Sequence, residues 1–147
     1  MSSLRETITK EKGEFAFSAN YLKDATWDEG LREFFEYRDL GITEATKQQV
    51  KAHIIRVKEN GDPSSLHTTG LHIHELEFQM IYILKGWIRF IYHLTGEDGR
   101  IREEEHKFGP GDCCLQPPKI VHNELECSND LELLEVTLPA KYRTKVV

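Results

Sequence analysis

The pattern of apolar and polar positions divides the chain into an N-terminal arm and a longer body rich in predicted strands. From Val50 onward, short apolar runs are separated by turn residues, and no helical period lies between them. The runs are "AHIIRV", "FQMIYIL", "WIRFIYHL", "REEEHKF" and "LELLEVTL", and the turns include "ENGDPSS", "GEDG" and "GPGD". Closely spaced strands without intervening helices favour an antiparallel sandwich or barrel. We therefore expect an all-β body over residues 48–147, preceded by an arm over residues 1–47.

The arm contains one segment with helical periodicity, "TWDEGLREFFEYRDLG" at residues 26–41. Thr26 can serve as the N-cap with Glu29 three residues later, and Gly41 provides a stop. The apolar stripe consists of Trp27, Leu31, Phe34 and Phe35. We expect one short amphipathic helix here, which packs on its own body or on that of a neighbouring copy, and we expect the chain to form a homodimer.

Composition and charge limit the number of domains and the kinds of binding partner that we expect. With 147 residues and 39% hydrophobic content, the chain can bury one packed core and is too short for two ordinary domains. The formal net charge is −6 and the 19 Lys and Arg are scattered, so we expect no nucleic-acid partner. No apolar run approaches the roughly 20 residues of a membrane span. The start, "MSSLRETITKEKGEF", lacks the apolar core of a signal peptide. We expect a cytoplasmic protein with no membrane partner.

The cysteines indicate no disulfide framework. Cys113, Cys114 and Cys127 are odd in number and do not follow a CxxC spacing, which also argues against a zinc ribbon. We expect buried, reduced thiols. We expect no catalytic cysteine.

Two histidines one residue apart, His72 and His74, are the first candidates for metal ligands. Side chains two apart in a strand share a face, so both imidazoles point to the same side. Gln79 reaches that side only if the "ELE" segment turns the chain into a second strand, and we expect a hairpin there. Glu75 and Glu77 are alternative oxygen donors, although they fall in the proposed turn.

The segment "GPGDCCLQPPKIVHNE" contains a third candidate imidazole. His122 comes there after two prolines that end a short strand. The chain resembles the cupin superfamily over about residues 50–139. His72, His74 and Gly86 match the first cupin motif, G-x5-H-x-H-x(3,4)-E-x6-G, with Gln79 at the position of the glutamate. Gly111, Pro117 and His122 match the second, G-x5-P-x-G-x2-H-x3-N. The chain departs from the motifs at three positions. Its first glycine is Gly70 instead of one near Leu66, Lys119 stands at the second glycine of the second motif, and Glu126 stands at the asparagine. None of these positions supplies a metal ligand.

The resemblance implies a double-stranded β-helix (jelly-roll) barrel that holds a divalent metal with His72, His74, Gln79 and His122. Imidazole nitrogens and an amide oxygen suit Zn, Fe, Mn, Ni or Cu, and such a site can leave positions open for a small-molecule substrate. The other histidines, His53, His67, His93 and His106, are interpreted as ordinary hydrogen-bonded residues.

The glutamine at position 79 favours Lewis-acid chemistry. A glutamate would lower the net charge of the centre, whereas a neutral carbonyl leaves the metal strongly polarising. Glutamine at this position is similar to that of pectin-degradation proteins that open unsaturated sugar acids and of some polyketide cyclases. We expect isomerisation, cyclisation or ring opening of a small oxygen-bearing molecule. A metal-dependent dioxygenase and a non-enzymatic ligand-binding or sensing barrel are the alternatives.

Glu135 is the candidate for proton transfer. In "LELLEVTL" it shares a strand face with Leu131 and Leu133. If that face lines the barrel, an apolar pocket raises the pKa of Glu135, which can then act as a general acid or base beside the metal. A salt bridge at the rim is the alternative interpretation.

Overall fold

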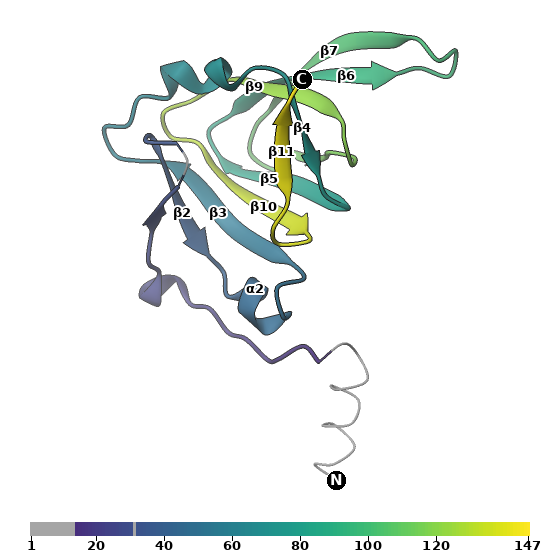
Figure 1. Ribbon diagram of the computed structural model, residues 1–147. Coiled ribbons are helices and arrows are strands. Elements are labelled where there is room, and N and C mark those ends of the chain that lie inside the picture. Colours follow the sequence, from purple (N-terminus) through teal and green to yellow (C-terminus); the bar gives the residue numbers. More distant parts are fainter. Residues whose placement is uncertain (1–13, 31) are drawn as a thin grey trace.

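Two antiparallel β-sheets form the protein in a computed structural model that describes residues 14–30 and 32–147 (Figure 1). The larger sheet has six strands in the order β1-β2-β3-β10-β5-β8, and the smaller has five in the order β11-β4-β9-β6-β7. The larger sheet comprises β1 (Asp28–Glu29), β2 (Phe35–Asp39), β3 (Lys51–Val57), β10 (Glu132–Leu138), β5 (Phe78–Lys85) and β8 (Cys113–Leu115). The smaller comprises β11 (Arg143–Val146), β4 (His72–Glu75), β9 (Val121–Cys127), β6 (Ile88–Thr95) and β7 (Ile101–Phe108). The described residues also form the short helices η1 (Leu22–Asp24), α2 (Ile42–Ala45) and η2 (Pro63–Thr69).

The strand-rich body predicted from residue 50 onward is confirmed. In β5, Ile81 and Ile83 are buried whereas Tyr82 and Leu84 are exposed, because successive side chains of a strand point to opposite faces. Strands β6 and β7 form the antiparallel hairpin expected around the "GEDG" turn, and this hairpin projects at the upper right of Figure 1. Among the described residues, no helix is long and apolar enough to cross a membrane.

Apolar side chains from both sheets meet in one core. The larger sheet contributes Ile83 and Leu133, and the smaller contributes Phe90 and Tyr92, all of them buried. Burial of this kind stabilises the fold by roughly 25 cal/mol per Å² of apolar surface. The rings of Phe90 and Tyr92 lie 6.4 and 6.0 Å from the ring of His122. Core packing therefore supports one side of the candidate site.

The amphipathic helix predicted for residues 26–41 is wrong. Strands β1 and β2 lie in this segment, and β2 pairs with β3 near the edge of the larger sheet. Phe35 and Tyr37 alternate with polar residues, so both can face the interior from a strand. A Cβ on Gly30 would overlap the ring of Tyr37, and glycine also disfavours a helix. Leu31, part of the predicted stripe, lies outside the described residues. Pairing with β3 thus overrides the local helical period, and part of the predicted arm joins the larger sheet.

The hairpin predicted at "ELE" is also wrong. Strand β4 belongs to the smaller sheet and β5 to the larger, so the short segment between them carries the chain from one sheet to the other. Both sheets direct one face toward a shared interior. His74 and Gln79 therefore line the same cavity from different sheets.

Candidate metal centre

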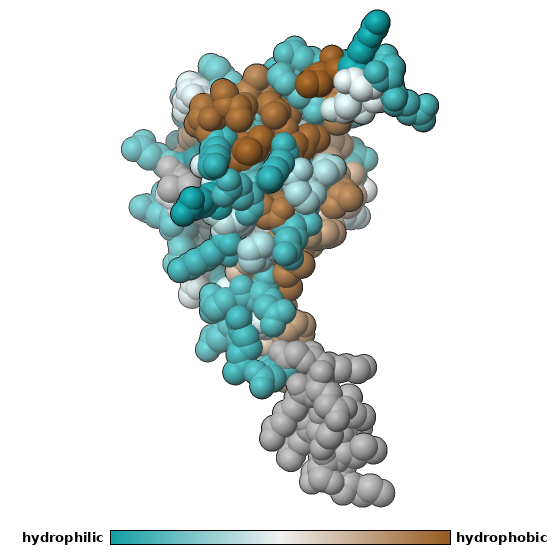
Figure 2. Space-filling model, turned by 45° about the vertical axis from the view of Figure 1, so that its right-hand side comes forward, coloured by the Kyte–Doolittle hydropathy of each residue, from teal (hydrophilic) through white to brown (hydrophobic). Residues whose placement is uncertain are grey.

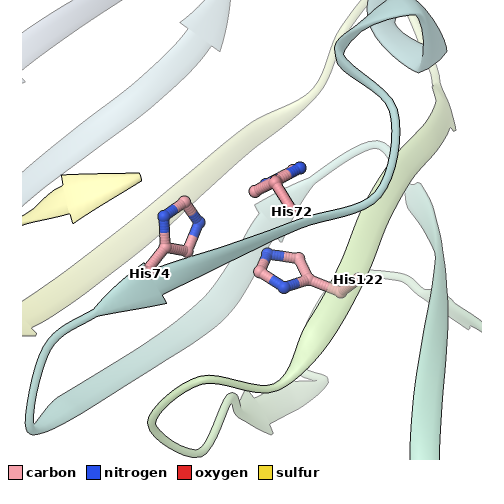
Figure 3. A group of neighbouring side chains, drawn as sticks. All are labelled: His72, His74 and His122. Atoms are coloured by element: carbon pink, nitrogen blue, oxygen red, sulfur yellow. The ribbon is translucent and has the colours of Figure 1, made fainter. Parts of the chain in front are cut away.

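Three histidines converge between β4 and β9 of the smaller sheet. Their ligand nitrogens all lie within 4.8 Å of one another, so the group could hold one metal ion. His72 stands directly opposite His122 where β4 pairs with β9, and His74 follows two residues along β4. Figure 3 shows the three rings gathered between these two strands. The structure thus brings together the three imidazoles selected from the sequence.

One nitrogen of each ring is held by a hydrogen bond. The Nδ1 atom of His72 lies 2.8 Å from the carbonyl oxygen of Gly70, that of His122 lies 2.9 Å from the carbonyl oxygen of Ile120, and that of His74 lies 2.8 Å from Oγ1 of Thr144. A carbonyl can only accept, so Nδ1 of His72 and of His122 carries the proton and Nε2 keeps a free lone pair. The Nε2 atom of His122 is buried without a hydrogen-bond partner among the described residues. This arrangement is typical of histidines that bind a metal through Nε2.

The surroundings favour neutral rings. Burial, together with the neighbouring His122 and His72, lowers the pKa of His74 to about 4. Burial likewise lowers the pKa of His122. Neutral imidazole is the form that binds metal ions, because a proton on the ligand nitrogen would compete with the ion. The three residues therefore fit a divalent transition metal.

Gln79 and Glu135 line the same cavity from the larger sheet. Gln79 is 4% exposed, and its amide nitrogen donates a hydrogen bond to Oε2 of Glu135 at 3.0 Å. The other carboxylate oxygen, Oε1, lies 2.8 Å from Nε2 of His53. Glu135 shares the inner face of β10 with Leu133, as the strand pattern predicted. The carboxyl group is therefore held between two side chains.

The expected rise in the pKa of Glu135 is not found. Burial raises the pKa of this carboxyl, but hydrogen bonds from His53 and Gln79, together with the charge interaction with His53, outweigh burial and lower the pKa below its usual value. Glu135 is therefore a carboxylate at neutral pH. In this state it can accept a proton.

The cavity beside the histidines has a volume of about 470 Å³. Tyr37 and Tyr142 line it, and the ring of Tyr142 lies 5.4 Å from that of His74. Burial raises the pKa of Tyr37 to about 12 and also raises the pKa of Tyr142, so both hydroxyls keep their protons and can donate hydrogen bonds. Arg32 and Glu124 also line the cavity. A small organic molecule with oxygen substituents suits such a mixture of aromatic and charged walls.

Solved structures with the same architecture share little sequence with this chain. The polyketide cyclase RemF from Streptomyces resistomycificus is 20% identical, over 90% of this chain and 86% of its own, with a TM-score of 0.62. Oxalate decarboxylase from Lactobacillus farciminis is 17% identical, over 86% of this chain and 35% of its own, with a TM-score of 0.56. HppE in its Fe(II) form is 12% identical, over 84% of this chain and 61% of its own, with a TM-score of 0.55. The chain has the cupin fold.

No family model matches this cupin-fold chain, and a search of curated proteins finds no match. The chain spans about a third of the oxalate decarboxylase, whose remaining part has no counterpart here. At these identities the likeness shows the cupin fold alone. The chemistry has to be argued from the site.

Sequence reasoning assigned no role in the site to Arg32, Tyr37, Glu124 or Tyr142, and it interpreted His53 as an ordinary hydrogen-bonded residue. His53 is hydrogen-bonded, as predicted, but its partner is the carboxylate that was itself a candidate. Arg32 falls in the segment predicted to be helical. Glu124 follows His122 by two residues, so the two-residue period of a strand was a signal that could have indicated it.

The alternative oxygen donors considered from the sequence lie outside the cavity lining. The carboxylate of Glu75 forms a salt bridge with Lys145 at 2.9 Å. Glu77 is exposed between β4 and β5. Both are consistent with the expected role of solvated carboxylates near a turn.

Proposed function

We propose that this cupin-fold protein is a metalloenzyme that acts on a small oxygen-bearing organic substrate. In the proposal, His72, His74 and His122 bind a divalent transition metal, with Gln79 as the fourth ligand. The observation that carries the proposal is the gathering of three imidazole nitrogens within 4.8 Å, beside a cavity that also contains a buried carboxylate. The same donors suit Zn, Fe, Mn, Ni or Cu.

A bound ion would supply Lewis-acid polarisation of a carbonyl, enol or hydroxy-acid oxygen. Gln79 donates to Glu135 through its amide nitrogen, which leaves its carbonyl oxygen available as a neutral ligand. A neutral ligand preserves the positive charge of the centre, and this favours isomerisation, cyclisation or ring opening over redox chemistry.

Glu135 is the proposed catalytic residue because its carboxylate can take a proton from a carbon or hydroxyl of the substrate. The Nε2 atom of His53 holds the carboxylate in place at 2.8 Å. Tyr37 and Tyr142 retain their hydroxyl protons and can donate hydrogen bonds to substrate oxygens. The residues of the cavity thus provide a proton acceptor and hydrogen-bond donors around one reacting centre.

A metal-dependent dioxygenase is the second candidate, because the three imidazoles of this site could equally hold a redox-active metal. Histidine and oxygen donors also suit iron, so the ligand set is compatible with both chemistries. Oxygen uptake with candidate substrates discriminates between them: the dioxygenase consumes oxygen in proportion to product, whereas the Lewis-acid enzyme does not.

The proposed function is tested by the metal content of the purified protein and of four variants. We expect His72→Ala, His74→Ala and His122→Ala each to lose most of the metal, because ligands bind the ion cooperatively as a set. His93→Ala is the matched control, since His93 is paired with Glu103 away from the cavity. Equal metal content in all four variants would disprove the site.

The proposal also includes the assembly, a cytoplasmic homodimer in which each chain closes into a double-stranded β-helix barrel. The homodimer is supported by apolar side chains on the outer face of the larger sheet. Tyr82, Leu84 and Leu115 are 38%, 45% and 59% exposed there, on the neighbouring strands β5 and β8. The face drawn in Figure 2 likewise has apolar side chains gathered in patches among polar ones. A second copy would cover part of this exposed surface.

A further inference from the structure

We propose that Glu124 supplies a carboxylate ligand to the metal held by the three histidines. This inference rests on the proposed function, because it presumes that the histidines bind an ion. It adds a donor that neither cupin motif contains, from β9 of the smaller sheet, whereas Gln79 stands on β5 of the larger.

The placement of Glu124 follows from strand geometry. Glu124 and His122 are two residues apart in β9, so their side chains lie on the same face. Glu124 lines the same cavity as His72 and His74. The carboxylate and three imidazoles therefore share one side of the paired strands.

One carboxylate oxygen of Glu124 lies beside His72. Oε2 of Glu124 lies 3.7 Å from Nε2 of His72, which is the nitrogen left free by the hydrogen bond at Nδ1. This oxygen is buried and has no hydrogen-bond partner among the described residues, and the same is true of Nε2 of His122. A carboxylate oxygen and a neutral imidazole nitrogen are both acceptors. Leaving them buried without hydrogen bonds is costly, and a cation held by the histidines would satisfy Nε2 of His122 and attract Oε2 of Glu124.

The carboxylate of Glu124 would replace the one that the cupin motif places at position 79. Gln79 stands where the cupin motif has glutamate, and its amide is engaged with Glu135. The carboxylate that is missing from β5 is thus supplied from β9. Carboxylate oxygen is a common partner of imidazole in first-row metal sites, so the combined set remains suitable for the same ions.

Arg32 limits the charge that this carboxylate brings. Its Nη2 atom lies 3.6 Å from Oε2 of Glu124, while Nη1 donates to the carbonyl oxygen of Leu66 at 3.0 Å and Nη2 donates to Thr69. The guanidinium is therefore fixed beside the carboxylate, and its positive charge offsets the negative one. The centre keeps a cationic character, as the Lewis-acid proposal requires.

The test measures Co(II) binding by the full-length apoprotein, using competition with a chromophoric chelator and visible absorption of the bound ion. Glu124→Gln keeps the shape of the side chain and removes its charge. We expect roughly tenfold to hundredfold weaker Co(II) binding and shifted absorption bands in this variant. Glu126→Gln is the matched control, because Glu126 lies two residues further along β9 and pairs with Arg89 on the surface.

A second variant, Glu124→Asp, keeps the charge and withdraws the oxygens by one methylene. A ligand at this position predicts weaker binding and altered absorption for Asp as well, whereas a purely electrostatic role predicts wild-type values. The inference is overturned if Glu124→Gln and Glu124→Asp match Glu126→Gln in affinity and spectrum while His122→Ala loses the ion. That result would leave the proposed function intact. If the wild-type protein itself binds no metal, the proposed function fails together with the inference.

Discussion

The Nε2 atom of His53 and the Oε1 atom of Glu135 lie 2.8 Å apart across the paired strands β3 and β10. The two residues are direct partners in the register of these strands, although 82 positions separate them in the chain. Their side chains are only 12% and 15% exposed. A carboxylate that is largely shielded from water needs hydrogen-bond donors, and His53 and Gln79 provide them.

Removing His53 tests this relationship. We expect His53→Ala to lower the free energy of unfolding by about 1–3 kcal/mol, because the buried carboxylate of Glu135 loses a donor. Urea unfolding at neutral pH measures the change, and His93→Ala, whose carboxylate partner Glu103 is exposed, is the control. In the double variant with Glu135→Gln, the loss caused by His53→Ala should shrink. Equal effects of the His53 and His93 substitutions would contradict a structural role for the pair.

Replacing Gln79 by glutamate separates the two candidate chemistries. We expect Gln79→Glu to retain or tighten metal binding, since a carboxylate is the stronger ligand. Lewis-acid turnover should fall, because the added negative charge reduces polarisation of the substrate. In a dioxygenase the same charge eases oxidation of the metal and should help the reaction with oxygen. Metal affinity and turnover are measured together, with Gln79→Ala as the control. Unchanged affinity and activity in Gln79→Ala would remove Gln79 from the ligand set.

The cysteines should differ in reactivity. Cys113 is exposed at the edge strand β8, contrary to the expectation of buried thiols, whereas Cys127 is buried in the core. Burial raises the pKa of Cys127 to about 12. The thiolate is the reactive form, so a raised pKa keeps Cys127 protonated and slow to react as the pH rises from 7 to 10.

Alkylation with iodoacetamide, followed by peptide mass spectrometry, measures this difference. At pH 8 we expect Cys113 to be labelled and Cys127 to be spared in the folded protein. In concentrated urea both should be labelled at similar rates, because unfolding removes the burial. Fast labelling of Cys127 under native conditions would contradict its place in the core.

The homodimer proposal is tested at the outer face of the larger sheet. We expect light scattering to give the mass of a dimer for the wild-type protein and of a monomer for Leu84→Glu, because a charge there would be buried in the interface. Ile101→Glu is the control, since Ile101 is 70% exposed on β7 of the other sheet. A wild-type monomer, or a dimer that survives Leu84→Glu, would refute an interface at this face.

Local sequence patterns were sufficient to predict the strands of the body and the placement of His72 and His74 on one face of a strand. Both depend on the two-residue alternation of an extended chain, which the order of residues specifies directly. The shared face of Leu133 and Glu135 follows from the same alternation. The spacing of the cupin motifs similarly indicated His122 before any contact was known.

Only the tertiary structure decided the rest. Residues 26–41 have a helical period, but hydrogen bonding of β2 to β3 makes the segment extended. The register of β4 against β9 sets His72 opposite His122, and that of β10 against β3 sets Glu135 opposite His53. These pairings join residues far apart in the chain. Their contacts, and the lowered pKa of Glu135 that results, depend on packing between whole strands, which no local period encodes.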